Sequence, residues 1–209
     1  MKLIVSDFDL TFYDSNYEEN IKLVNDFVFK GNIFVIATGR SIKLLKKDIE
    51  NENINFEYLI CSDGAVILDK EFNILKNIVF EENTIKSIIN ILKSDDNLIN
   101  IEIDESITGI SGIYAVFNNM EYALEKLNYI LNNYNVSGYL SNHGINIINK
   151  NISKVNGVEY IKNILNIDDN DIYTVGDNIN DLEMINKYNG YIIGKDVKNF
   201  KEFISKIKE

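Results

Sequence analysis

Cysteine, proline and tryptophan are scarce or missing in this chain of 209 residues, which has one cysteine, no proline and no tryptophan. A single cysteine cannot form an internal disulfide, so the sequence excludes a secreted fold held together by disulfides. No run of about 18 apolar residues is free of charge, which excludes a transmembrane helix. The first apolar run is short and ends at Asp7, so we expect no signal peptide and a cytoplasmic protein.

Positive charge is also in short supply. The chain has 21 Lys and Arg residues against 32 Asp and Glu residues, which gives a formal net charge of −11. Binding to nucleic-acid phosphates needs clustered cations, so we expect no nucleic-acid partner, and we expect no membrane partner either. A hydrophobic fraction of 45% and a charged fraction of 25% are typical of a globular protein. The length predicts one domain, or one domain with an insertion.

Short apolar runs alternate with amphipathic helical patterns at both ends of the chain. The runs are bounded by Gly, Asp, Asn or Ser, which is typical of buried strands in a parallel sheet. This alternation predicts an α/β core of three layers, with helices on both faces of a Rossmann-like parallel sheet. The predicted strands are Leu3–Val5, Ile33–Ala37, Tyr58–Cys61, Ile172–Val175 and Tyr191–Ile193.

The middle of the chain has a different pattern. From about residue 80 it reads helix, two strands, helix, two strands. Ile99, Ile101 and Ile103 alternate with polar residues, as in a half-buried antiparallel strand. The sequence therefore predicts a core formed by residues 1–79 and 150–209, with a small α+β domain of residues 80–149 inserted into it.

Polar residues follow the predicted core strands at the point where each strand ends. In an open α/β sheet, ligands bind outside the carboxyl ends of the strands, so these residues predict a single site. They are Asp7, Asp9 and Thr11, then Thr38, Gly39 and Arg40, then Asp63, then Asp177, Asn178, Asn180 and Asp181, with Lys154 at the start of a late helix.

The acidic residues at this edge favour a hard cation. Asp7 and Asp9 are two residues apart, so in an extended backbone their side chains start on the same face. Carboxylates that are packed together do not all ionise cheaply unless a cation joins them. Oxygen ligands suit Mg²⁺ where a phosphate shares the coordination sphere, and the cluster lacks the His and Cys that zinc prefers.

These motifs, in this order, resemble those of the haloacid dehalogenase (HAD) superfamily of phosphohydrolases, over essentially the whole chain. The segment from Asp7 to Thr11 resembles the first motif, Asp-x-Asp-x-Thr, Thr38 resembles the second, and Lys154 resembles the third. Residues 176–181, Gly-Asp-Asn-Ile-Asn-Asp, resemble the fourth. The insert is similar to the cap of the Cof-type sugar phosphatases. Leu10 and Asp63 depart from that branch, which commonly has Gly and Asn there.

The resemblance implies a Mg²⁺-dependent phosphatase that hydrolyses a small phosphorylated metabolite, most simply a sugar phosphate, through an aspartyl-phosphate. Asp7 would be the nucleophile, and at its ordinary pKa of about 3.9 it would be ionised at neutral pH. Asp9 would protonate the leaving group and then activate water. The Asp7 carboxylate, the Asp9 backbone carbonyl and Asp177 would hold Mg²⁺, and Lys154 would hold the phosphoryl group.

The resemblance assigns supporting roles to the remaining polar residues. Thr38, the Gly39 amide and Asn180 would donate hydrogen bonds to the phosphoryl oxygens. Asp181, with Asn178 beside it, would orient Lys154 or a metal-bound water. The candidate substrate contacts are Arg40, Asp63 and His143, although Arg40 also suits a salt bridge at a helix start and His143 suits an exposed turn.

Other functions use similar residues. A phosphomutase or a phosphoglycolate-type phosphatase shares the same core, and a degenerate member would bind a phosphorylated ligand without turnover. A receiver-like signalling domain also has an acidic pocket, a Thr and a Lys, but its phosphorylated Asp follows the third strand and it has no cap insert. The expected assembly is a monomer or a weak homo-oligomer.

Overall fold

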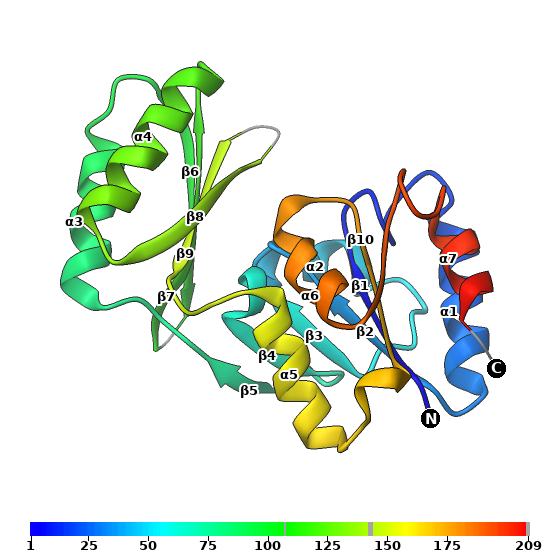
Figure 1. Cartoon of the computed structure of the whole chain (residues 1–209). Coiled ribbons are helices and arrows are strands. Elements are labelled where there is room, and N and C mark those ends of the chain that lie inside the picture. Colours follow the sequence, from blue (N-terminus) through cyan, green and yellow to red (C-terminus); the bar gives the residue numbers. More distant parts are fainter. Residues whose placement is uncertain (107, 142–143, 208–209) are drawn as a thin grey trace. The chain divides into compact units, whose positions relative to one another are not determined.

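The computed structural model describes residues 1–106, 108–141 and 144–207 (Figure 1). The chain divides into two compact units, Met1–Leu75 with Ser153–Glu209, and Lys76–Ile152. The predicted boundaries, 79/80 and 149/150, differ from these by a few residues. The reason is local, because Asn77 donates to Ser106 and Thr108, and Asn149 donates to the Val79 carbonyl, so residues 76–79 pack with the second unit.

The first unit is built on a seven-stranded sheet in the order β11-β10-β1-β2-β3-β4-β5. β11, β10, β1, β2 and β3 run parallel, and β4 pairs antiparallel to β3. The sequence predicted the five parallel strands, and the α/β fold class is confirmed. It did not predict β4 or β5. The strands are β1 (Leu3–Asp7), β2 (Ile33–Ala37), β3 (Tyr58–Cys61), β4 (Val66–Asp69), β5 (Ile74–Asn77), β10 (Ile172–Gly176) and β11 (Asn189–Ile192).

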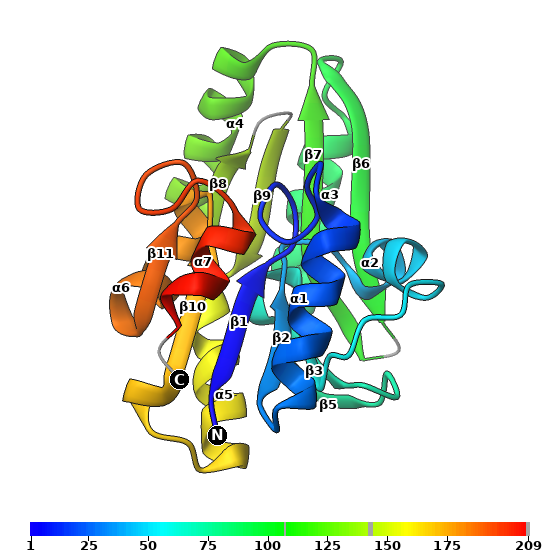
Figure 2. The same cartoon turned by 90° about the vertical axis from the view of Figure 1, so that its right-hand side faces the viewer.

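Helices lie on both faces of this sheet. Figure 2 shows α1 (Tyr17–Phe29) and α7 (Phe200–Lys206) on one face, and α5 (Lys154–Leu165) and α6 (Leu182–Lys187) lie on the other face (Figure 1). α2 (Ile42–Ile49) connects β2 to β3, and Ser41 caps its first turn by accepting from the Leu44 amide. Short 3₁₀ turns, η1 (Ser62–Gly64), η2 (Asp169–Asp171) and η3 (Ile179–Asp181), complete the connections.

Fully buried strand residues form the core of the first unit. Leu3, Val5, Val35, Ala37 and Ile60 have no exposed surface and pack with apolar residues of α5 and α6. Each buried Leu, Val or Ile side chain contributes about 1.5–3 kcal/mol to folding. The core therefore fixes the strands rigidly, and with them the residues at the carboxyl ends of the strands.

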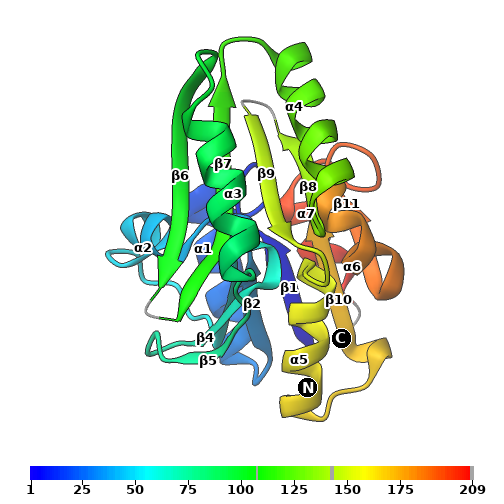
Figure 3. The same cartoon turned by 90° about the vertical axis from the view of Figure 1, so that its left-hand side faces the viewer.

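The second unit is a four-stranded antiparallel sheet, in the order β6-β7-β9-β8, with two helices on one face (Figure 3). Along β7 buried and half-exposed residues alternate, and Ile113, Ala115 and Phe117 point into the core against the helices. Glu81 and Asn119 cap the two helices. The elements are α3 (Glu82–Lys93), β6 (Leu98–Ser106), β7 (Gly109–Phe117), α4 (Met120–Asn133), β8 (Val136–Ser141) and β9 (Gly144–Asn149).

Among the described residues, no helix has the length and apolar character needed to cross a membrane.

Candidate active site

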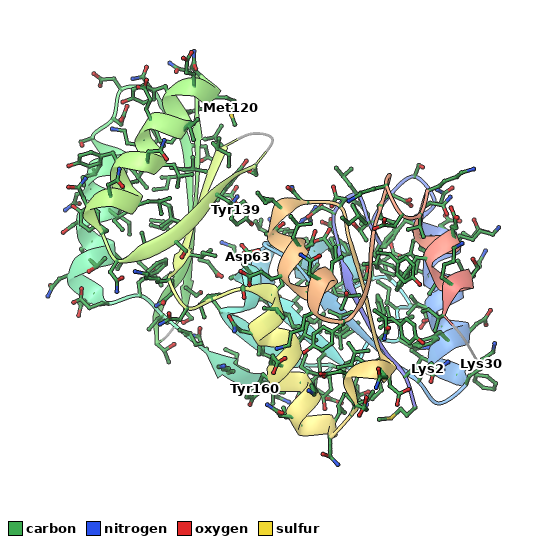
Figure 4. The ribbon with its side chains drawn as sticks, in the orientation of Figure 1. Lys2, Lys30, Asp63, Met120, Tyr139 and Tyr160 are labelled. Atoms are coloured by element: carbon green, nitrogen blue, oxygen red, sulfur yellow. The ribbon has the colours of Figure 1, made fainter. Side chains whose placement is uncertain are left out.

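The predicted site residues of the first unit lie at the carboxyl edge of the parallel strands. Asp7 is the last residue of β1, Thr38 follows β2, and Asp177 follows β10. Asp63 follows β3, and in Figure 4 it is labelled at the end of the sheet opposite to Lys2, which precedes β1. This edge therefore brings together residues that are up to 174 positions apart in the sequence, from Asp7 to Asp181 (181 − 7 = 174).

Lys154 joins the first strand to the fourth motif. Its Nζ lies 2.5 Å from Asp7 Oδ1 and 2.7 Å from Asp181 Oδ1, and all three side chains are buried. A buried charge is costly unless it is paired, so the lysine and the carboxylates depend on one another. Burial acts to lower the pKa of Lys154, but Asp7 and Asp181 outweigh it and raise that pKa, which keeps the lysine charged.

Gly64 sets the start of the helix that carries Lys154. Its φ is +103°, and a Cβ at this position would lie 2.3 Å from the carbonyl oxygen of Ser153. Only glycine tolerates both the left-handed conformation and so close a backbone contact. Lys154 is the first residue of α5, so this contact fixes where its side chain begins.

Asp181 is held on both oxygens. One oxygen accepts from Lys154, and the other accepts from the amides of Asp177 and Asn178, at 3.2 and 3.1 Å. Asn178 and Asp181 together cap η3. A Cβ at position 176 would lie 2.4 Å from the Asp181 carboxyl carbon, so the glycine that opens this motif leaves room for the carboxylate.

Three carboxylates gather at this point. One oxygen each from Asp7, Asp177 and Asp181 lie within 4.8 Å of one another, and Thr11 donates to Asp177 at 3.3 Å. A donor set of oxygens alone fits a hard divalent cation such as Mg²⁺. The Asp9 side chain is not a member of this cluster.

The cluster changes the acidity of its members. Burial is the largest cause that raises the pKa of Asp7, Lys154 opposes it and Asp181 adds to it, and together they bring this pKa to about 8. Burial and Asp181 likewise raise the pKa of Asp177. A neighbouring cation lowers the pKa of a carboxyl group, so a bound metal would favour the ionised form of Asp7.

Arg40 binds two of the protein's own carboxylates. Its Nε and Nη2 donate to the two oxygens of Asp9 at 2.8 and 2.5 Å, and its Nη1 donates to Asp48 in α2. The guanidinium carbon also lies 5.2 Å from the centre of the Phe8 ring. This geometry matches the alternative in which Arg40 forms a salt bridge at the helix start. Asp48 was not among the predicted site residues.

Hydrogen bonds connect the loops that carry the phosphate-binding candidates. Asn180 Nδ2 donates to Asp63 Oδ1 at 2.8 Å, and the Asp63 amide donates to the Thr38 carbonyl at 3.0 Å. The Thr38 hydroxyl accepts from the Arg40 amide at 3.1 Å, with Gly39 between them in the chain. The structure therefore brings Thr38, Gly39, Asp63 and Asn180 together. His143 lies outside the described residues.

Sequence comparison identifies the family. The sequence pattern of haloacid dehalogenase-like hydrolases matches residues 4–138 and 113–208. The chain belongs to this family. A relative in Buchnera aphidicola, whose name gives it as a candidate phosphatase, is 26% identical over 223 residues, which cover 88% of this chain and 82% of that protein. An uncharacterised protein of Mycoplasma capricolum is 31% identical over 107 residues, 48% of this chain and 40% of that protein.

Solved structures share the HAD fold. A HAD-like hydrolase of B. subtilis has a TM-score of 0.81 at 16% identity, with 98% of this chain and 92% of that chain covered. A HAD/COF-like hydrolase of Plasmodium vivax gives 0.80 at 16%, covering 99% and 95%. The sucrose-phosphatase of Synechocystis, solved with sucrose and phosphate, gives 0.71 at 14%, covering 92% and 82%. The predicted Cof-type HAD resemblance is confirmed, and the family match with the Buchnera relative supports a phosphatase-type hydrolase.

Proposed function

We propose that this HAD hydrolase is a Mg²⁺-dependent phosphatase acting on a small phosphorylated metabolite, with sugar phosphates as the preferred class. The observation that carries the proposal is the position of Lys154, which is buried and pairs with Asp7 and Asp181. Asp177 lies in the same cluster of carboxylates. A phosphate monoester is an anion, and an anionic nucleophile attacks it only when positive charge lies between the two. Lys154 supplies one such charge.

In the proposed reaction, a carboxylate oxygen of Asp7 forms a bond to phosphorus and the bond to the leaving oxygen breaks. Asp9 gives its proton to that oxygen. In the second step Asp9 takes a proton from water, which attacks the aspartyl-phosphate and releases inorganic phosphate and free Asp7.

Thr38, the Gly39 amide and Asn180 would hold the phosphoryl oxygens during both steps. Asp7 and Asp177, with the Asp9 carbonyl, would hold Mg²⁺, which when bound neutralises charge on the phosphoryl oxygens. Both oxygens of Asp181 are already engaged, which supports a role in positioning Lys154.

The proposal is tested by replacing the proposed nucleophile, Asp7. Asp7→Asn should lower phosphate release from para-nitrophenyl phosphate with Mg²⁺ by at least about 10³-fold, because the amide cannot form the phospho-enzyme. Asp26→Asn, an exposed neutral substitution in α1, is the matched control and should keep wild-type turnover. Near-normal turnover of Asp7→Asn would contradict the proposal.

The same assay separates a phosphatase from the alternatives. A phosphomutase would phosphorylate Asp7 yet release little free phosphate, and a binding protein without turnover would do neither. Three further expectations stay predictions. They are that the second unit is a cap that closes over the leaving group, that the protein is cytoplasmic, and that it is a monomer or a weak homo-oligomer.

A further inference from the structure

Arg40 is the only arginine of the chain and is shared between two carboxylates. Two of its nitrogens meet the two oxygens of Asp9, and a third nitrogen meets Asp48. A planar guanidinium that binds a carboxylate through two parallel bonds fixes its orientation as well as its position. The Phe8 ring under the guanidinium adds a further contact. Arg40 therefore sets where the Asp9 carboxylate rests.

This arrangement bears on the proton that Asp9 must deliver in the proposed reaction. An oxygen of Asp9 that carries a proton cannot also accept a hydrogen bond from Arg40 along that lone pair. The other lone pair of that oxygen can still accept, but more weakly once the oxygen carries a proton, so delivery of a proton from Asp9 loosens the hold of Arg40 on it. Its side chain is 46% exposed, which leaves it room to turn.

Asp48 is at an unfavourable position for a carboxylate in a helix. It lies in the last turn of α2, and a helix carries partial negative charge at this end, which disfavours a carboxylate. Its side chain is 35% exposed, so the core does not require it either. The ion pair with Arg40 explains its presence. Asp48 competes with Asp9 for the positive charge of Arg40. Its ion pair also keeps the guanidinium in place when Asp9 moves.

We propose that Asp48, acting through Arg40, is a positioning residue that lets Asp9 leave its resting ion pair to protonate the leaving group. The proposal rests on the phosphatase function proposed above. Without the charge of Asp48, all of the Arg40 charge is left to Asp9. Asp9 is then held more firmly, the guanidinium follows it when it turns, and protonation of the leaving group is slower.

The test compares two leaving groups in Asp48→Asn. Phenol is a much weaker acid than para-nitrophenol, so phenyl phosphate depends more on the proton from Asp9. The ratio kcat/KM reports the steps up to departure of the leaving group. We expect Asp48→Asn to lower kcat/KM about 10-fold for phenyl phosphate and less than about 2-fold for para-nitrophenyl phosphate, a fraction of what general acids contribute.

The matched control is Asp169→Asn, which neutralises an aspartate paired with Lys162 at the opposite edge of the sheet and should leave both ratios unchanged. An equal loss on both substrates in Asp48→Asn, or no loss on either, would overturn the proposal.

A second measurement does not depend on turnover. A single arginine gives a single Nε–H signal in a ¹H–¹⁵N spectrum of the full chain. We expect this signal to exchange slowly with water in the wild type, to exchange faster in Asp9→Asn, and to shift in Asp48→Asn. If neither substitution changes it, the positioning proposal is wrong. If the wild type hydrolyses neither aryl phosphate, the proposed function fails, while this signal still decides whether Asp48 and Arg40 hold Asp9.

Discussion

Three residues at the candidate site have backbone conformations that side chains normally avoid. Leu10, Ser62 and Asp63 have φ values of 57°, 50° and 55°, in the left-handed region. Such conformations cost about 1–3 kcal/mol each and persist only where surrounding contacts impose them. All three follow β1 or β3, so the strain is concentrated at the edge of the sheet that carries Asp7 and Lys154.

Gly176 offers a test at this scale. In Gly176→Ala the new methyl group would lie 2.4–2.5 Å from atoms of Asp181, so the carboxylate must move and its contact with Lys154 must change. We expect a loss of stability of about 1–3 kcal/mol and a drop in turnover of about 10-fold or more, because Lys154 loses one of its two partners. Urea unfolding and phosphate release measure the two effects.

The control for this substitution is Gly31→Ala. Gly31 has a φ of +84° but no atom within 4 Å of its missing Cβ, and it lies between α1 and β2. It should lose stability without losing turnover per folded molecule. If Gly176→Ala keeps both stability and turnover, the crowding around Asp181 is not what fixes Lys154.

The sequence predicted which residues gather at the site better than it predicted their partners. Asp7, Asp177 and Asp181 meet because strand ends meet, which alternation alone implies. The pair of Asp9 with Arg40 spans 31 residues and depends on side-chain conformations that periodicity does not encode. An acidic residue in the last turn of a helix is a signal that could have pointed to Asp48, and the sequence analysis did not use it.

At the scale of elements, an ion pair ties α4 to the start of β6 in the second unit. Asp95 precedes β6, and it accepts from the Tyr122 hydroxyl at 2.7 Å and pairs with Lys126 at 2.6 Å. Tyr122 and Lys126 are one turn apart on α4. Burial acts to raise the pKa of Asp95, but the bonds from Lys126 and Tyr122 prevail and lower it to about 2.

Asp95→Asn should therefore destabilise the protein in a pH-dependent way. The folded-state pKa lies below the unfolded value of about 3.9, so the carboxylate stabilises the fold above about pH 4 and that contribution is lost as pH falls toward 2. We expect a loss of about 1 kcal/mol at pH 7, after allowance for screening by solvent, and almost none near pH 2. Urea unfolding of both proteins at several pH values measures the difference. A loss that does not change with pH would contradict this account.

The hairpin of β4 and β5 shows where element prediction failed. The turn between them, residues 69–73, has no glycine or proline to announce it. Instead, Asp69 accepts from the amides of Glu71 and Asn73, and Phe72 takes a φ of 63°. The turn is made by side-chain hydrogen bonds and by a phenylalanine in the left-handed backbone conformation. A search for the residue types that usually form turns does not find it.

At the scale of the whole molecule, the net charge of −11 and the cluster of Asp7, Asp177 and Asp181 both favour binding of a divalent cation. A ligand that binds only the folded state stabilises it by about 2.7 kcal/mol at 100 times its Kd. Saturating Mg²⁺ should then raise Tm by about 5–10 °C over the value in EDTA, with ionic strength matched by KCl to remove general screening.

Asp177→Asn removes one carboxylate of the cluster and should abolish most of this shift, whereas Asp26→Asn should keep it. Differential scanning calorimetry with and without MgCl₂ is the measurement. An equal shift in Asp177→Asn would mean that Mg²⁺ binds elsewhere on the acidic surface.

The order of the strands also bears on how the chain assembles during synthesis. β1 pairs early with β2, but its second partner is β10, where Leu3 pairs with Ile172, so β1 waits for that partner until 169 further residues are made (172 − 3 = 169), roughly 10–30 s at ribosomal speed. The sheet of the second unit, β6 to β9, draws every partner from one contiguous stretch and has no such delay. The inserted unit is therefore complete while the surrounding sheet is still open, and Asp7 meets Asp177 only after nearly the whole polypeptide has left the ribosome.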